Sequence, residues 1–201
     1  MRPKEAFEYA KFHGSSDETR KIVCEDSYWA INYAYYNDKA PREETRKAAC
    51  RTPYYAYFYA RDIDECPWDN TREAACKDPE YAYKYALIID KEPRENTRKA
   101  TCENPYWAFY YAKEVDEKPR DDTREAACKN PTWAYFYARD VDKKSGENTR
   151  KAACKNPECA YLYARNIDKC FYQETWEAIK GTEFEEEYKK LFNKLMKEKI
   201  I

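Results

Sequence analysis

The chain has 201 residues, and its 37 Lys and Arg against 38 Asp and Glu exclude the basic excess typical of nucleic-acid-binding proteins. Only three Gly occur, so glycine-rich phosphate-binding loops are excluded as well. Charged residues make up 37% of the chain, but 21 Tyr and an aromatic content of 17% provide enough apolar area for a folded core. No apolar run approaches the roughly 20 residues that span a bilayer, and Met1 to Ala10 lack an apolar secretory core, so we expect a cytoplasmic protein.

A unit of 26 residues recurs through the chain six times. Each unit carries a Thr-Arg pair, and a cysteine follows each pair at constant spacing without a slip of one residue. A fixed period of roughly 20–50 residues is typical of solenoids, in which each unit buries its apolar face against its neighbours. The pairs are Thr19-Arg20, Thr45-Arg46, Thr71-Arg72, Thr97-Arg98, Thr123-Arg124 and Thr149-Arg150, and the cysteines are Cys24, Cys50, Cys76, Cys102, Cys128 and Cys154.

The repeat predicts one domain over residues 1–201, an all-α solenoid, right- or left-handed, of six 26-residue helix-turn-helix repeats. Ala6-Phe7-Glu8-Tyr9-Ala10 matches the core motif of the second helices, which predicts an N-terminal half-repeat. A capping-box pattern at Thr182 and Glu185 opens a C-terminal capping helix, with apolar residues at Phe184, Tyr188, Leu191 and Leu195. We place the half-repeat at 1–16, the repeats at 17–42, 43–68, 69–94, 95–120, 121–146 and 147–172, and the C-terminal cap at 173–201.

The fifth unit illustrates the two helices that each repeat is expected to form. Acidic residues at its start complement the dipole of a first helix of roughly ten residues, whose inner face is small: Ala126, Ala127 and Cys128. Asn130-Pro131 then provides an N-cap and a first helical residue for a second helix over 131–142. The broad apolar face of that helix is formed by Ala134, Tyr135, Tyr137, Ala138 and Val141, at helical spacing.

The nine cysteines do not have the spacing of a disulfide framework. Equivalent positions in stacked helical repeats lie about 8–10 Å apart, whereas a disulfide needs Cα atoms within about 7 Å. We therefore expect the six cysteines of the ladder to be small buried side chains, with Cys66, Cys159 and Cys170 as candidates for exposed thiols. There is no Cys-x-x-Cys and His13 is the single histidine, so we expect no metal and no cofactor.

An aspartate accompanies the arginine of every unit at constant spacing. Pairing within units leaves no residue unpaired, whereas pairing each Asp with the next unit would leave Arg20 alone and bring Asp168 to Trp176. We therefore predict buried Arg–Asp pairs that fix the registry of the helices. The alternative is a row of arginines facing an anionic ligand. The aspartates are Asp38, Asp64, Asp90, Asp116, Asp142 and Asp168.

Comparison of the units with one another shows which positions the scaffold does not dictate. In the second helix, four variable positions share one stripe at i, i+4, i+7 and i+11. Contiguous exposed aromatic residues rimmed by charge usually mark an interface. Aromatic stripes at helical spacing also occur as core, so the rings could instead be wedged between adjacent second helices. The candidate partner-binding residues are Tyr28, Tyr54, Phe58, Arg61, Tyr106, Tyr110, Lys113, Phe136, Arg139, Leu162 and Arg165.

These patterns favour a non-enzymatic scaffold that binds a protein partner through the stripe, since Tyr, Trp and Arg dominate interface hot spots. An inhibitor or decoy, as in a virus–host interaction, would have the same sequence features. The alternative is single-stranded nucleic-acid or nucleotide binding, with bases stacked on the aromatic side chains. An enzyme is the third hypothesis, but no nucleophile–base pair, phosphate loop or metal set is found, and we expect no catalytic residues.

The alternation of short helices resembles the general class of helical-hairpin tandem repeats, such as HEAT-like and tetratricopeptide arrays. The resemblance covers most of the chain and implies an α-solenoid. It is architectural only, because the 26-residue unit is shorter than the repeats of those families and the tetratricopeptide Trp-Leu-Gly-Tyr spacing is missing. The resemblance therefore implies no functional residue.

Overall fold

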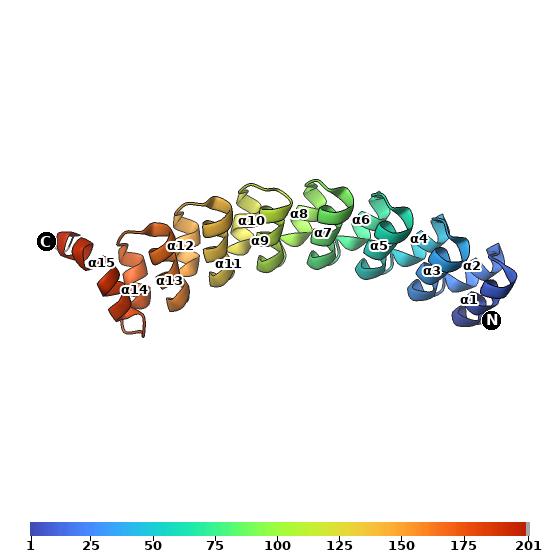
Figure 1. Ribbon diagram of the computed structural model, residues 1–201, viewed down its shortest axis with the longest axis horizontal. Coiled ribbons are helices and arrows are strands. Elements are labelled where there is room, and N and C mark those ends of the chain that lie inside the picture. The colour runs from blue at the N-terminus through green and yellow to red at the C-terminus, as the bar shows by residue number, and fades with distance from the viewer. Residues whose placement is uncertain (200–201) are drawn as a thin grey trace. The chain divides into compact units, whose positions relative to one another are not determined.

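The computed structural model describes the backbone of residues 1–199 and the side chains of residues 1–193 (Figure 1). In that part of the chain all regular secondary structure is helical, and short hairpins follow one another as the predicted α-solenoid. The chain divides into two compact units, Met1–Thr101 and Cys102–Ile201, with the boundary between the two helices of the fourth repeat. None of the described helices combines the length and apolar composition that crossing a bilayer requires.

The first helices of the repeats contain seven residues each, so the predicted length of roughly ten is wrong. In the six repeats, each of them ends at the residue before the cysteine of the ladder, and the next helix begins almost at once, with a proline in every repeat but the first. Proline cannot continue a helix, and the residue before it is driven out of the helical region. The first helices are α2 (Asp17–Val23), α4 (Glu43–Ala49), α6 (Asp69–Ala75), α8 (Glu95–Thr101), α10 (Asp121–Ala127) and α12 (Glu147–Ala153), and α14 (Gln173–Ile179) is the equivalent helix of the C-terminal cap.

The predicted N-caps of the second helices are confirmed. In the fifth repeat the Asn130 side chain accepts a hydrogen bond from the backbone N–H of Thr132 at 3.0 Å, and Pro131 is the first helical residue. Asn, Asp and Thr satisfy otherwise unpaired N–H groups at such positions. The second helices are α3 (Ser27–Tyr33), α5 (Pro53–Tyr59), α7 (Pro79–Tyr85), α9 (Pro105–Glu114), α11 (Pro131–Phe136) and α13 (Pro157–Tyr163).

The second helices do not end as α-helices. All but α9 continue into a π-helical turn, so the predicted extent 131–142 is correct but its last turn is of another type. After each second helix, one non-glycine residue with a φ between 51° and 55° ends the turn. This geometry brings the aspartate of the repeat to the arginine of the first helix. The π-turns are η1 (Ala34–Asp38), η2 (Ala60–Asp64), η3 (Ala86–Asp90), η4 (Tyr137–Asp142) and η5 (Ala164–Asp168).

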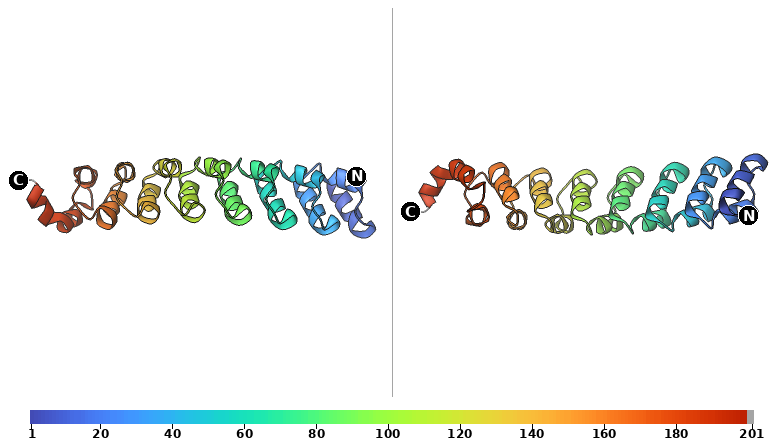
Figure 2. Two further views of the ribbon diagram at one scale, coloured as in Figure 1. Left: turned by 90° about the horizontal axis from the view of Figure 1, so that it is seen from above. Right: turned by 90° about the horizontal axis from the view of Figure 1, so that it is seen from below.

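Within each of the two compact units, the first helices of successive repeats form one row and the second helices form another (Figure 2). Alanines of the first helices are fully buried against tyrosines of the second helices. Ala49 lies in one cluster with Ala34 and Tyr59, and Ala75 lies in another with Tyr57 and Tyr85. The predicted packing of large side chains on small ones is confirmed.

The N-terminal helix α1 (Pro3–His13) covers the first repeat. Ala6, Phe7 and Ala10 are buried against Val23 and Tyr33, as expected of a half-repeat. Tyr9 is 47% exposed, although its motif matches the core of the second helices. Its ring stacks on His13 at 4.0 Å between centroids, on the surface of α1 itself.

The C-terminal helix α15 (Glu185–Lys199) covers the last repeat. Tyr188 and Phe192 are buried in one cluster with Phe171 and Ile179 of the preceding segment. Leu191 is exposed, so its predicted place in the core is wrong, and the side chain of Leu195 lies outside the described residues. The helix begins at Glu185, so the predicted capping box of Thr182 and Glu185 is wrong. Instead, the Glu185 carboxylate accepts a hydrogen bond from the Gly181 N–H, and the Thr182 hydroxyl accepts one from the Phe184 N–H.

All nine cysteines are free thiols. Those of the ladder are half-buried, which corrects the expectation of buried side chains, and burial raises the pKa of Cys50, for example, to about 11. Cys66 is exposed and Cys170 is half-buried, but Cys159 is buried, which corrects the expectation of an exposed thiol there. Cys159 lies on a second helix, where it packs against Ala153 and Tyr163.

In the first, second, third, fifth and sixth repeats, a buried tyrosine hydroxyl joins the two helices. In the second repeat the Tyr59 hydroxyl lies 2.7 Å from Thr45 Oγ1 and accepts a hydrogen bond from the Arg42 N–H at 2.9 Å. Arg42 is the N-cap of α4 and provides no side-chain cap of its own. The tyrosine therefore satisfies the helix start from the neighbouring helix, and burial raises its pKa above the ordinary value. The same contact joins Thr19 to Tyr33, Thr71 to Tyr85, Thr123 to Tyr137 and Thr149 to Tyr163.

We expect Tyr59→Phe to lower the free energy of unfolding by about 1–3 kcal/mol, because it leaves the Arg42 N–H and Thr45 hydroxyl without this partner. Equilibrium unfolding in urea measures the change. Tyr54→Phe is the matched control, since Tyr54 is 45% exposed on the same helix. Equal effects of the two substitutions would show that the buried hydroxyl does not stabilise the start of α4.

Candidate functional site

Five of the six repeats lie entirely within one of the two compact units. In each of these five repeats, the arginine is paired with the aspartate of the same repeat, as predicted. The Arg46 guanidinium binds Asp64 at 2.6 Å, with the two side chains 9% and 0% exposed. The Asp90 carboxylate likewise raises the pKa of Arg72 above its ordinary value. The guanidinium groups are therefore occupied, which disfavours a row of arginines that meets an anionic ligand. The other pairs are Arg20–Asp38, Arg72–Asp90, Arg124–Asp142 and Arg150–Asp168.

The two rows of helices present different surfaces to solvent. In the described part of the chain, no exposed large hydrophobic residue lies within any of the seven-residue first helices. Their exposed positions are charged or polar, such as Lys47, Glu73 and Glu125. Exposed rings lie on the second helices and their π-turns, at Tyr28, Tyr35, Tyr36, Tyr54 and Tyr106. Two more, Trp68 and Tyr172, are the N-caps of α6 and α14.

The first position of the stripe holds exposed rings that reach the following repeat. Tyr28 is 48% exposed, Tyr54 is 45% exposed and Tyr106 is 36% exposed. The Tyr54 ring lies edge-on to Tyr81 at 5.7 Å, and the Tyr106 ring lies edge-on to Trp133 at 4.8 Å. Each ring is thus held by a neighbour while one part of it faces solvent.

The second position is half-buried, so the two interpretations of the stripe, exposed rings or wedged rings, apply to different positions. Phe58, Tyr110, Phe136 and Leu162 pack against the buried clusters between consecutive repeats. At this position the interpretation as wedged core residues is the correct one.

The third position holds exposed cations, which are Arg61, Lys113, Arg139 and Arg165. Three of them lie beside carboxylates. Arg61 binds Asp62 at 2.6 Å, Arg139 binds Asp140 at 2.6 Å, and Lys113 lies 4.0 Å from Asp140. Arg139 accordingly lowers the pKa of Asp140. The stripe therefore carries cations whose charge is largely compensated within the face.

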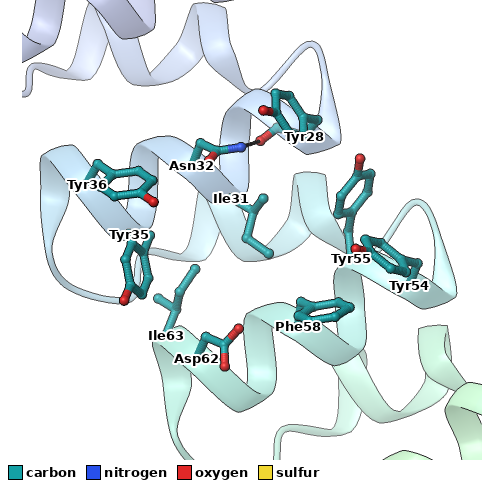
Figure 3. A pocket seen from close by; sticks show the side chains of 10 residues that line it. All are labelled: Tyr28, Ile31, Asn32, Tyr35, Tyr36, Tyr54, Tyr55, Phe58, Asp62 and Ile63. Carbon is teal, nitrogen blue, oxygen red and sulfur yellow. Dashed lines mark hydrogen bonds between the residues drawn. The ribbon is translucent and has the colours of Figure 1, made fainter.

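A groove of about 300 Å³ opens on this face between the first and second repeats (Figure 3). Its walls come from α3 with η1 and from α5 with η2, and Asp62 is its single charged residue. Sequence comparison missed Tyr35, Tyr36 and Tyr55 as site residues. The signal was the replacement of a basic residue by Tyr35 at the third position of the stripe. The groove is lined by Tyr28, Ile31, Asn32, Tyr35, Tyr36, Tyr54, Tyr55, Phe58, Asp62 and Ile63.

The described residues contain no group of three or more His, Cys, Asp or Glu side chains arranged to hold a metal ion. No protein-family model, curated protein or solved structure matches this chain. The chemistry of the second-helix face is therefore the basis for a functional proposal.

Proposed function

We propose that this protein is a non-enzymatic repeat scaffold that binds a protein partner through the face formed by its second helices. The observation that carries the proposal is the placement of exposed tyrosines on that face. Their exposed fractions run from 36% for Tyr106 to 57% for Tyr36, whereas the outer surface of the first helices is charged. Exposed aromatic residues within a polar rim are typical of interfaces, and Tyr contributes large contact area at low entropic cost. An inhibitor or decoy would use the same face.

Compensation of charge supports a protein partner over a single-stranded nucleic acid. Phosphate binding requires cations that can release counterions from the nucleic acid. Arg61 and Arg139 each make two hydrogen bonds to a neighbouring aspartate, and Lys113 lies beside Asp140 as well. The whole chain carries a formal net charge of −1. Aromatic contacts with little electrostatic excess fit a protein surface better than a polyanion.

Capture from a cell lysate with and without nuclease tests the proposal. The triple variant Tyr28→Ser, Tyr54→Ser and Tyr106→Ser removes exposed rings and spares the half-buried second position. Its matched control is Lys47→Ser, Glu73→Ser and Glu125→Ser, at exposed positions of the first helices. We expect the native protein and the control to retain a nuclease-resistant protein partner, and the tyrosine variant to lose it.

Two other results would contradict the proposal. A partner lost on nuclease treatment, with binding that falls steeply as salt rises, would favour the nucleic-acid alternative. A partner lost with the first-helix control and retained by the tyrosine variant would place the interface on the other row of helices. Thermal melting of both variants shows that either result comes from folded protein.

A further inference from the structure

At two places in the array, an aromatic N-cap of a first helix covers the arginine of the preceding repeat. The Arg46 guanidinium lies 4.2 Å from the ring centroid of Trp68, the N-cap of α6. The Arg150 guanidinium lies 3.5 Å from the ring centroid of Tyr172, the N-cap of α14. A cation over an aromatic face is attracted by the negative charge density of the ring. The chain therefore uses this position to close off a guanidinium group with a ring.

Gly146 stands at this position between the fifth and sixth repeats, as the N-cap of α12. Its backbone angles, φ −140° and ψ 140°, are close to those of Trp68, φ −126° and ψ 143°. Such extended geometry suits any residue, so the backbone does not require glycine here. The effect of the glycine is that Arg124, the arginine of the preceding repeat, lacks the side chain that an N-cap supplies elsewhere.

The Arg124 side chain is accordingly the one that solvent reaches. It is 24% exposed, against 9% for the arginines of four other repeats, Arg20, Arg46, Arg72 and Arg150. A hollow of about 450 Å³ opens beside it, with walls from α10, the end of η4, residues 144–146 and the start of α12. The space that a ring fills beside the arginine in two other repeats is therefore open here.

Hydrogen bonds already occupy the edge of the Arg124 guanidinium. Its Nε and Nη2 donate to Asp142 at 3.0 Å and 2.8 Å, and its Nη1 donates to Asp121 at 2.6 Å. The oxygens of an anionic ligand would have to compete with these two carboxylates. The Tyr137 ring lies 5.7 Å from the guanidinium, a contact that recurs in the second and third repeats. Because the in-plane donors are bound, a ligand gains most by stacking on the planar face of the group.

We propose that this hollow binds a tryptophan or tyrosine side chain presented by a protein segment, with the ring stacked on the Arg124 guanidinium. The ring would take the place that Trp68 and Tyr172 fill in the other two pairs. Polar residues such as Glu147 and Asn148 line the hollow, and they suit an indole N–H or a phenol O–H, which need a partner when buried. The site lies on the row of first helices, so it is a second contact surface beyond the second-helix face of the proposed function.

Nuclear magnetic resonance titration of the full chain tests the proposal with three capped peptides of the form Gly-Gly-X-Gly-Gly, in which X is Trp, Phe or cyclohexylalanine. Cyclohexylalanine keeps the apolar ring of Phe but has no π-electrons. We expect the Trp peptide to shift the Arg124 Nε–H and Gly146 amide resonances in a saturable manner. We also expect cyclohexylalanine to bind at least fivefold more weakly than Phe. Equal binding of these two peptides, or shifts confined to the second helices, would overturn the proposal.

A variant that fills the hollow provides the second arm. Gly146→Trp introduces the ring that the third repeat carries as Trp68, and Gly146→Ala is the matched control. Both variants add a Cβ, which would lie 3.1 Å from Thr149 Oγ1, so the difference between them isolates the ring. We expect Gly146→Trp to melt at a higher temperature than Gly146→Ala and to lose at least tenfold in affinity for the Trp peptide, whereas Gly146→Ala retains that affinity.

Equal peptide affinities of the two variants would show that the ring site is elsewhere and would overturn the proposal. Should Gly146→Trp melt early, the comparison of Phe with cyclohexylalanine on the native chain still decides.

Two further measurements separate a protein segment from other sources of a ring. Adenosine that shifts the same resonances and binds at least as tightly as the Trp peptide would assign the hollow to a nucleobase. Sedimentation equilibrium shows whether a second copy of the chain supplies the ring. A dimer formed by Gly146→Ala and absent in Gly146→Trp would assign the hollow to self-association. Either result would overturn the proposal, and a monomer with weak adenosine binding would support it.

Discussion

Asp64→Asn is expected to lower the free energy of unfolding by about 3–5 kcal/mol, the range for breaking one side of a buried ion pair. The Asp64 side chain is fully buried, and its partner Arg46 is 9% exposed. Arg46 cannot lose its proton at any ordinary pH, so the substitution leaves a buried cation facing a neutral amide. Equilibrium unfolding in urea at pH 7 measures the loss.

Asp62→Asn is the matched control two residues away. Asp62 also binds an arginine, but the side chains of this pair are 36% and 37% exposed, and such surface pairs contribute about 0–1 kcal/mol. A small effect of Asp64→Asn, close to that of the control, would show that the buried pairs do not hold the two helices of a repeat together.

Enlargement of the small face of a first helix is expected to have a comparable effect. Ala127 is fully buried and Ala126 is 3% exposed, and Ala127 packs in one cluster with Ala112 and Tyr137. Leucine at each position overpacks the contact between helices, at a cost of about 1–3 kcal/mol for each side chain. The combined variant Ala126→Leu and Ala127→Leu should therefore melt well below the native protein.

The control for this experiment is Glu125→Leu, which adds an apolar side chain at an exposed position of the same helix. Exposed substitutions of this kind usually change stability by about 0.5 kcal/mol or less. An unchanged melting temperature for the alanine variant would mean that the first helices do not pack closely through these alanines.

Much of the fold follows from local signals in the sequence. The 26-residue period predicts the solenoid, and Asn130-Pro131 correctly predicts where a second helix begins because N-capping depends on residues next to one another. The pairing of arginine with aspartate could also be predicted, because a regular array leaves only a few ways of matching the two ladders. These features require no knowledge of how far apart the helices lie.

Other features depend on distances that the sequence does not contain. The π-turns at the ends of the second helices depend on tertiary packing, which overrides local helix preference. The hydrogen bond between Thr45 and Tyr59 joins residues on different helices, and nothing in either motif indicates it. Within the stripe, Tyr54 is exposed and Phe58 is half-buried, because the spacing between neighbouring second helices decides which rings are wedged between them.

The groove was missed for a related reason. Comparison of the units drew attention to positions where aromatic residues recur, whereas Tyr35 is a single departure from the basic residues common at its position. Only the structure shows that Tyr35 and Tyr36 line a groove together with Tyr54 and Tyr55 of the next repeat.

The polar contacts that join the two helices of a repeat connect residues close together in the chain. The Thr45–Tyr59 contact spans 14 residues and the Arg46–Asp64 pair spans 18. Chains dominated by such short separations have low contact order and fold rapidly, because little loop-closure entropy is lost before the contacts form. Each 26-residue segment thus contains both partners of the contacts that join its two helices. Duplication or deletion of one segment would therefore lengthen or shorten the array and leave the contacts within the other segments unchanged.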